Sequence, residues 1–306
     1  MIRAASSLGA LLTIALVAFG GNALAAAAPG FASPELAVDA LVAAVRGGDP
    51  AAIEHVLGPG SRKLVDSGDS VADKTDRKTF IESFDAKHAI EPHDTDATLL
   101  VGTDAWPFPI PLRKAPDGWH FDARAGAQQI LDRRIGRNEL AAIATCRAIV
   151  DAERDYASEQ RGDGQFVEYA QKFMSSPGKQ DGLYWKVAAG APASPLGPLV
   201  AEARAQGYHG RHTPYHGYFF KILKSQGPNA RGGARDYVVR GHMIGGFAIV
   251  AYPAKWRDSG VMTFIVDQDG VVYQRNLGHS TARLAAQMTR YDPDSHWTLV
   301  AEAASH

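Results

Sequence analysis

Hydrophobic and polar residues repeat with two different periods along this chain. Residues 215–278 contain five runs rich in Val, Ile, Phe and Tyr, and clusters of Gly, Pro or Asn separate most of them. Such runs are typical of strands bounded by turns. The pair Asp269-Gly270 favours a two-residue hairpin turn, because Asp-Gly supplies the positive backbone angles that this turn requires. The segment is therefore predicted to be an antiparallel sheet.

A helical period extends over residues 126–160. The segment has no proline, and it carries one apolar stripe together with a second apolar face. The first stripe consists of Leu140, Ile143, Cys146, Val150 and Ala157. This pattern predicts one long helix that is covered on two sides, with a bend near Gly136 left open. A short helix is predicted over residues 166–174, and another ends near Gly207.

Residues 31–123 begin with helical patterns and end with extended ones. Ser33 and Pro34 suit the cap and first position of a helix, and helices are predicted over 34–47, 50–57 and 76–88. After residue 97 the pattern predicts strands, and the repeated prolines of WPFPIP place that run at a sheet edge. Helices followed by a curved, cone-like sheet resemble the nuclear-transport-factor-like and cystatin-like domains.

Together these patterns predict an α+β protein with two domains. The expected domains are residues 26–125, with helices and a curved antiparallel sheet, and residues 126–306, with the long central helix and a second antiparallel sheet packed on it. Residues 1–25 are predicted to be a signal peptide, because a basic residue, an apolar run and Ala-Leu-Ala follow one another. The protein is expected to be periplasmic or secreted, with no stable membrane anchor after cleavage.

The charge balance and the cysteine content of the chain limit its ligands and its covalent cross-links. The chain has 32 basic and 33 acidic residues and a formal charge of −1, which argues against nucleic acid as a ligand. Cys146 is the only cysteine, so no intramolecular disulfide is available. Its place on the apolar stripe predicts a buried thiol that packs as a small hydrophobe.

Three histidines lie close together in the sequence and raise the question of a metal. His209, His212 and His216 could offer imidazole ligands to zinc or copper. A proline and two glycines make this segment a loop, and no neighbouring carboxylate completes a ligand set. The favoured interpretation is a structural turn that leads into a strand, with no metal and no cofactor.

A second group of polar residues could line a pocket in the N-terminal domain. His88, Asp104 and His120 are the polar candidates, and Trp106 is an aromatic one. An apolar wall raises the pKa of a buried carboxyl group and can prepare it as a general base. Strand-end His and Asp residues are more often at the surface, so no catalytic residue is assigned.

Several strings carry a resemblance to a known family. WPFPIPL, RRIGRNEL, DGLYW, QGPNARGGA and SGVMTFIVDQDGVVYQ are similar to the bacterial secreted family known as domain of unknown function 2950. The resemblance covers the chain after the signal peptide and implies export and a two-part layout, but no activity. The C-terminal half also resembles the globular domain of type IV pilins and pseudopilins, in which a helix packs on a short antiparallel sheet. The charged turns before this helix differ from the apolar anchor of pilins.

These observations predict a non-catalytic binding or assembly component of the bacterial cell envelope, with an envelope protein as the expected partner. The alternative is a small-molecule hydrolase or isomerase whose site is the N-terminal pocket. An enzyme should bring two ionisable groups together in one concave site, whereas an assembly component should expose an apolar patch. Tyr215, Tyr218, Tyr252 and Trp256 are the aromatic candidates for such a patch.

Overall fold

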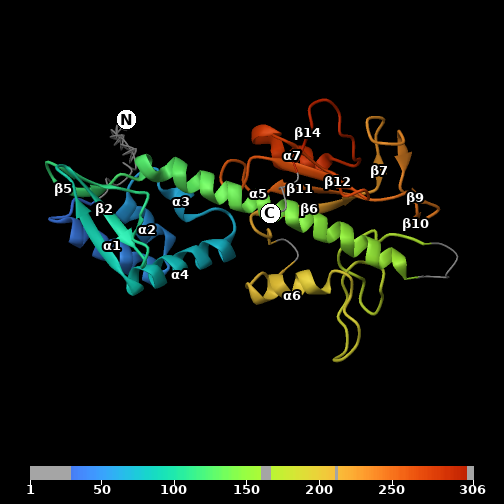
Figure 1. The fold of residues 1–306 in the computed structure, drawn as a ribbon, viewed down its shortest axis with the longest axis horizontal. Helices are drawn as coiled ribbons and strands as arrows, with labels where there is room; N and C mark the ends of the chain where they lie inside the picture. Colours follow the sequence, from blue (N-terminus) through green and yellow to red (C-terminus); the bar gives the residue numbers. More distant parts are fainter. Residues whose placement is uncertain (1–28, 160–166, 211–212, 302–306) are drawn as a thin grey trace, which may run out of the picture.

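The computed structural model describes residues 29–159, 167–210 and 213–301. The described residues form two groups of helices and strands, and one long helix joins them (Figure 1). The predicted signal peptide lies outside the described residues. Both groups contain helices and antiparallel strands, which confirms the α+β class.

The N-terminal group packs four helices against a five-stranded antiparallel sheet. Its elements are α1 (Pro34–Gly47), α2 (Pro50–Leu57), α3 (Arg62–Val65), α4 (Ser70–Ala86), β1 (His88–Pro92), β2 (Asp96–Val101), β3 (Trp106–Pro107), β4 (Leu112–Ala115) and β5 (Gly118–Phe121). The strand order is β1-β2-β4-β5, and β3 also pairs with β2. On β2 the alternate residues Ala97, Leu99 and Val101 are buried and contribute to the N-terminal core.

Side-chain caps explain where these helices begin. The Ser33 hydroxyl accepts a hydrogen bond from the Leu36 amide at 3.3 Å, and Asp49 accepts one from the Ala51 amide at 3.0 Å. These caps satisfy amides that have no partner within the first helical turn. The predicted third helix starts earlier than expected, at Ser70, because Asp69 caps it. Strand β1 was missed in the sequence, since its side chains are mostly exposed and do not alternate.

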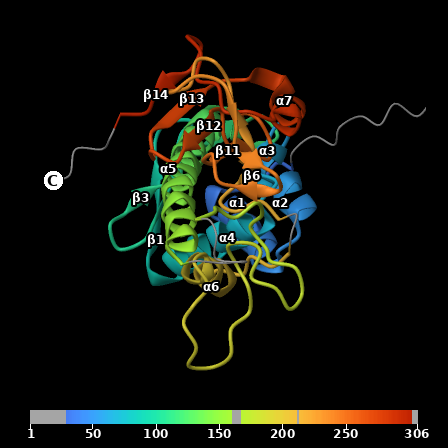
Figure 2. The same ribbon diagram turned by 90° about the vertical axis from the view of Figure 1, so that its right-hand side faces the viewer.

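The long helix α5 (Ala123–Ser158) begins beside the N-terminal group and ends in the C-terminal group. It continues through Gly136 without a break. The C-terminal sheet lies on one side of α5, and α6 (Gly197–Ala205) lies on the other (Figure 2). The helix is therefore covered on two sides, as the two apolar faces of its sequence predict. The predicted inner stripe is wrong at Leu140, which is 70% exposed, because Asn138 faces inward and a residue two positions later points almost to the opposite side.

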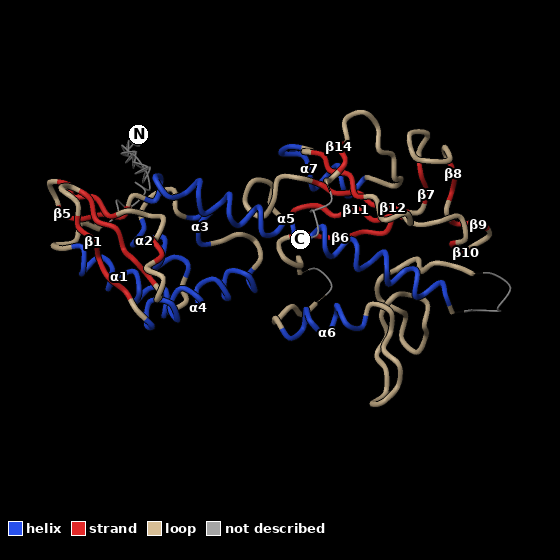
Figure 3. Tube along the Cα trace, in the orientation of Figure 1, coloured by secondary structure: helices blue, strands red, loops and turns tan. Residues whose placement is uncertain are grey.

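The C-terminal group is built around a second five-stranded antiparallel sheet, with the order β14-β13-β12-β11-β6. Its strands are β6 (Tyr218–Leu223), β11 (Ala248–Pro253), β12 (Thr263–Asp267), β13 (Val272–Arg275) and β14 (Thr298–Leu299). Two smaller pairs are β7 (Ser225–Gln226) with β8 (Arg235–Asp236) and β9 (Val238–Val239) with β10 (His242–Met243); η1 (Gly278–Ser280) and α7 (Thr281–Gln287) follow β13. Figure 3 shows the two sheets as separate groups of strands at the two ends of α5.

Two local predictions in this half were wrong. The hairpin at Asp269-Gly270 is present, but β12 and β13 first pair at Val266 and Val272, so the connection is longer than two residues. Residues 167–174 are not helical. Their amides bond elsewhere instead: the Tyr169 amide donates to the Met243 carbonyl at 2.9 Å, and the Ala170 amide donates to the Oε2 atom of Glu153 at 2.8 Å.

Two glycines on α5 make a matched test of how the helix packs on the N-terminal group. A Cβ atom at Gly126 would lie 2.3 Å from the Pro109 carbonyl oxygen, whereas a Cβ at Gly136 would meet nothing within 4 Å. We expect Gly126→Ala to lower the free energy of unfolding by about 1–3 kcal/mol, because the backbone of the neighbouring loop must move. Gly136→Ala is expected to raise it by about 0.5–1 kcal/mol, because Ala favours the helix. Urea unfolding measures both values, and equal effects of the two changes would contradict this packing.

Candidate functional site

The N-terminal group contains a cavity of about 450 Å³ between its helices, its sheet and the start of α5. Most of its wall is aliphatic or aromatic, with Leu41, Ile53, Phe80, Phe108 and Ile130 among the lining residues. A pocket of this size and composition matches those that hold small organic ligands. The cavity exists because the helices and the sheet meet around α5 without filling the space between them.

Four charged residues lie on the wall of this cavity: Asp73, Asp76, Arg77 and Arg134. Asp73 accepts the Ser67 amide at 3.1 Å, and Asp76 pairs with Arg137 of α5 at 2.9 Å. The Arg134 guanidinium donates to the carbonyl oxygens of Lys63 and Leu64, both at 2.7 Å. Asp76 and Arg134 thus hold α4 and α3 to α5, and Asp73 holds the loop between α3 and α4 to α4.

Burial shifts the pKa values of two groups on this wall. Desolvation raises the pKa of the Asp73 carboxyl group, and the Ser67 hydrogen bonds and the charge of Arg134 act in the opposite direction. Desolvation also lowers the pKa of the Arg134 guanidinium. No hydrogen bond or ion pair joins any two of the four wall residues. The wall therefore has a buried carboxyl group, Asp73, whose hydrogen bonds come from the Ser67 amide.

Next to the cavity, Asp69 connects the two groups of elements. Its carboxylate is fully buried and accepts four hydrogen bonds: from the amides of Val71 and Ala72 at the start of α4, from the Tyr208 hydroxyl at 3.0 Å and from the Gly217 amide at 2.8 Å. Gly217 has φ +74°, and a Cβ there would lie 2.6 Å from the Asn138 amide nitrogen. Only glycine fits this approach without strain.

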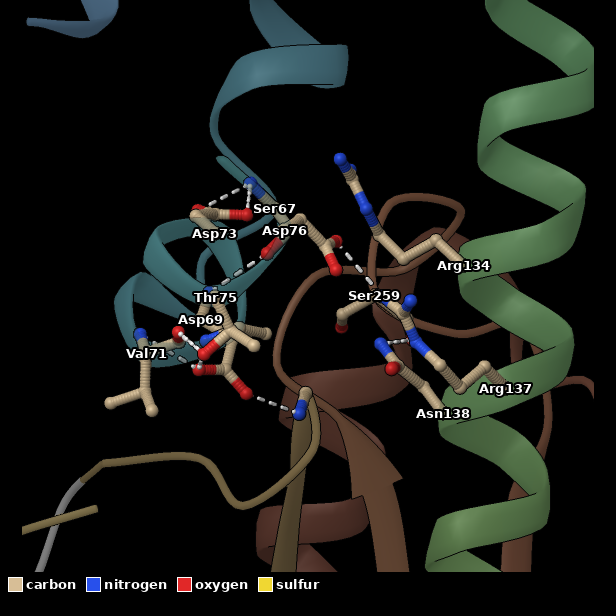
Figure 4. Close-up of polar contacts among 12 residues, drawn as sticks. Ser67, Asp69, Val71, Asp73, Thr75, Asp76, Arg134, Arg137, Asn138 and Ser259 are labelled. Atoms are coloured by element: carbon tan, nitrogen blue, oxygen red, sulfur yellow. Dashed lines mark hydrogen bonds and ion pairs between the residues drawn. The ribbon is translucent and has the colours of Figure 1, made fainter. Parts of the chain in front are cut away.

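Figure 4 shows Arg134, Arg137 and Asn138 projecting from α5 toward Asp73, Asp76 and Ser259. The Asn138 side chain donates to the Ser259 carbonyl at 2.9 Å. Two ion pairs reinforce the junction, Lys255 with Asp66 at 3.1 Å and Lys63 with Asp258 at 3.0 Å. The wall of the cavity and the contact between the two groups thus share one polar network.

The structure places one of the four expected pocket residues on the wall of the cavity and the other three elsewhere. Trp106 lines the cavity, whereas His88, Asp104 and His120 do not. His88 stacks on Phe84 with 3.8 Å between ring centroids, and Asp104 is exposed. His120 pairs with Asp117 at 2.9 Å and lies beside a separate hollow of about 320 Å³. The cavity instead takes its polar groups from α4 and α5.

The histidine loop is only partly within the described residues, since His212 lies outside them. His209 is exposed, and His216 is half-buried with its ring 4.2 Å from that of Tyr215 and 5.6 Å from that of Tyr208. Burial lowers the pKa of the His216 imidazole. Among the described residues, no three His, Cys, Asp or Glu side chains lie close enough to hold a metal ion.

The aromatic residues considered for a docking patch are not exposed. Tyr218 is fully buried and donates from its hydroxyl to the Met262 carbonyl at 2.9 Å. Tyr215, Tyr252 and Trp256 are half-buried.

Comparison with protein families identifies the family of this chain. The family model described as "Protein of unknown function (DUF2950)" matches residues 29–300. The chain belongs to this family. Membership confirms the resemblance carried by the sequence strings, and the family description assigns no activity. Neither the curated proteins nor the solved structures gave a match. The pilin-like resemblance of the C-terminal half therefore stays a prediction.

Within residues 29–159, 167–210 and 213–301, no helix combines the length and the apolar character needed to cross a bilayer.

Sequence reasoning missed Asp69, Asp73 and Arg134. The signal for Asp69 was present, because Ser-Gly-Asp-Ser precedes a helical period and Asp is a favoured N-cap. Asp73 and Arg134 gave no such signal. Each lies in a run of charged residues that is typical of a solvent-exposed helix face. The side chain becomes buried only when the elements pack together.

Proposed function

We propose that this protein is a non-catalytic binding protein of the bacterial cell envelope, and that the N-terminal cavity takes a small apolar or amphipathic ligand. The observation that carries the proposal is the cavity itself, which has an apolar wall and a volume of about 450 Å³. Three of its four charged groups are held by contacts within the fold. The assignment to the envelope rests on the predicted signal peptide.

Binding to the cavity is tested with N-phenyl-1-naphthylamine, a neutral dye whose fluorescence rises in apolar surroundings. We expect the purified protein without its signal peptide to bind the dye in one saturable site. Ile130→Trp should weaken binding about tenfold or more, because the larger side chain fills part of the cavity and removes buried apolar contact. Fluorescence titration measures both affinities.

Leu140→Trp is the matched control, because it places the same side chain on the same helix at a position that is 70% exposed. It should leave dye binding unchanged. Equal affinities of Ile130→Trp and the unaltered protein would show that the dye binds elsewhere and would contradict the proposal.

A second candidate is a hydrolase or isomerase that acts in the same cavity. It is favoured by Asp73, whose carboxyl group lies on an apolar wall with its pKa raised by burial. The two candidates differ in the fate of the ligand. A ligand extracted with the protein and recovered unchanged after prolonged incubation supports binding, whereas conversion that Asp73→Asn abolishes supports an enzyme.

A further inference from the structure

A second hollow adjoins the apolar cavity and differs from it in charge. It has a volume of about 440 Å³ and lies between the C-terminal end of α1 and the outer face of α4. Val45 and Arg77 line both hollows, so the two meet at these residues. We call the second hollow the basic groove. Its charged residues are Arg46, Lys74, Arg77, Lys78 and Glu82.

The charges of the basic groove are not balanced within the fold. Arg46 pairs with Asp85, and Lys78 pairs with Glu82 at 3.6 Å. Among the described residues, neither Lys74 nor Arg77 has a hydrogen bond or an ion pair from its side chain. Residues three positions apart share one face of a helix, so these two cations lie side by side on α4. The groove therefore has two cations ready for an external anion.

Within the described residues, the acidic residues of the neighbouring cavity form no ion pair with Lys74 or Arg77. Asp76 is engaged by Arg137 at 2.9 Å, and the Asp73 carboxylate accepts the Ser67 amide. Arg77 stands between the two hollows and is half-buried. A guanidinium at the mouth of an apolar cavity suits an anionic group whose remaining part is apolar.

We propose that the ligand of this protein is a single-chain anionic amphiphile. Its carboxylate or phosphate group would bind Lys74 and Arg77 in the basic groove, and its alkyl chain would pass Arg77 into the apolar cavity. This proposal rests on the proposed function, because it uses the same cavity, and it adds the chemical class of the ligand.

The test is displacement of N-phenyl-1-naphthylamine by compounds with a ten-carbon chain, all below their micelle concentrations. Decanoate and decyl phosphate are the anionic probes, decanol is the neutral one and decyltrimethylammonium is the cationic one. The anionic probes should bind at least about tenfold more tightly than decanol, because each gains a charge-assisted contact. Across octanoate, decanoate and dodecanoate, affinity should rise about fourfold per methylene while the chain enters the cavity.

Variants identify the residues responsible. Arg77→Gln should remove most of the preference for decanoate over decanol, and Lys74→Gln should reduce it. Lys114→Gln, on β4 outside both hollows, should leave the preference unchanged. Each of these changes removes one charge from an exposed or half-buried side chain, and near-ultraviolet circular dichroism checks that each variant folds.

The outcomes separate this proposal from the proposed function. If the dye and decanol bind in the cavity but decanoate binds no more tightly, the anionic ligand is refuted while a binding cavity stands. If inorganic phosphate alone displaces the dye as well as decyl phosphate does, the alkyl chain is not used and the proposal fails. If neither the dye nor any probe binds, both fail.

Discussion

Asp69→Ala is expected to lower the free energy of unfolding by about 4 kcal/mol. The change removes the N-cap of α4, a loss of about 1 kcal/mol. It also leaves the buried Tyr208 hydroxyl and Gly217 amide without an acceptor, at about 1–3 kcal/mol each. Because small proteins are stable by only about 5–15 kcal/mol in total, this is a large fraction. Urea unfolding followed by circular dichroism measures the difference.

Asp49→Ala is the matched control for this change. Asp49 also caps a helix, α2, but it is exposed, and among the described residues its side chain accepts a hydrogen bond only from the Ala51 amide, at 3.0 Å. The control should lose about 1 kcal/mol. Asp69→Asn should fall between the two, because the amide oxygen can still cap α4 while the amide nitrogen cannot accept from Gly217. Similar losses for Asp69→Ala and Asp49→Ala would show that the contacts to Tyr208 and Gly217 add nothing to stability.

The second large effect concerns Glu153, a fully buried residue on α5. Its Oε2 atom accepts the Ala170 amide at 2.8 Å, and its Oε1 atom has no hydrogen-bond partner among the described residues. Burial raises the pKa of this carboxyl group from 4.5 to about 8. The folded protein therefore holds this proton at neutral pH, whereas the unfolded chain releases it.

The sign of the pH dependence follows from this difference. Between pH 4.5 and about 8 the folded state binds one proton more than the unfolded state, so stability falls as pH rises. The slope from this group is about 1.4 kcal/mol per pH unit at most. Glu153→Gln replaces the acid with a neutral side chain of the same shape, and we expect it to remove this slope and to stabilise the protein at pH 8. Urea unfolding at pH 5, 6.5 and 8 provides the test.

Glu91→Gln serves as the control, since Glu91 is an exposed residue of β1. It should leave the slope of stability against pH as it is in the unaltered protein. Asp73 and Asp267, whose pKa values burial also raises, contribute to the total slope in both proteins, so the comparison between variants isolates Glu153. If Glu153→Gln and the unaltered protein lose stability equally between pH 5 and pH 8, Glu153 is ionised in the folded state.

The elements of the fold were largely predictable because their signals are local and periodic. The strand runs of the C-terminal sheet appeared as β6, β11, β12 and β13, and the long helix α5 appeared close to its predicted bounds. Errors arose where the local pattern was weak, as in the exposed strand β1, or where amides bond to distant groups, as at Ala170. The division into domains near residue 125 stays a prediction, with separate cores on the two sides of it.

The candidate site was less predictable. Of the four expected pocket residues, only Trp106 lines the cavity, while Asp73, Arg77 and Arg134 were not anticipated. A cavity is a gap between packed elements, so it has no pattern in the sequence. Its polar residues also look like ordinary members of charged helix faces until a second helix covers them.

The sequence by itself determined the periods of its helices and strands, and hence the α+β class and membership in its family, because each of these depends on residues near one another in the chain. Only the tertiary structure decided which polar groups meet. Asp69 bonds to Tyr208 and Gly217, which lie 139 and 148 residues away. A hydrogen bond forms over about 3 Å in space and leaves no period in the chain, so packing alone selects its partners.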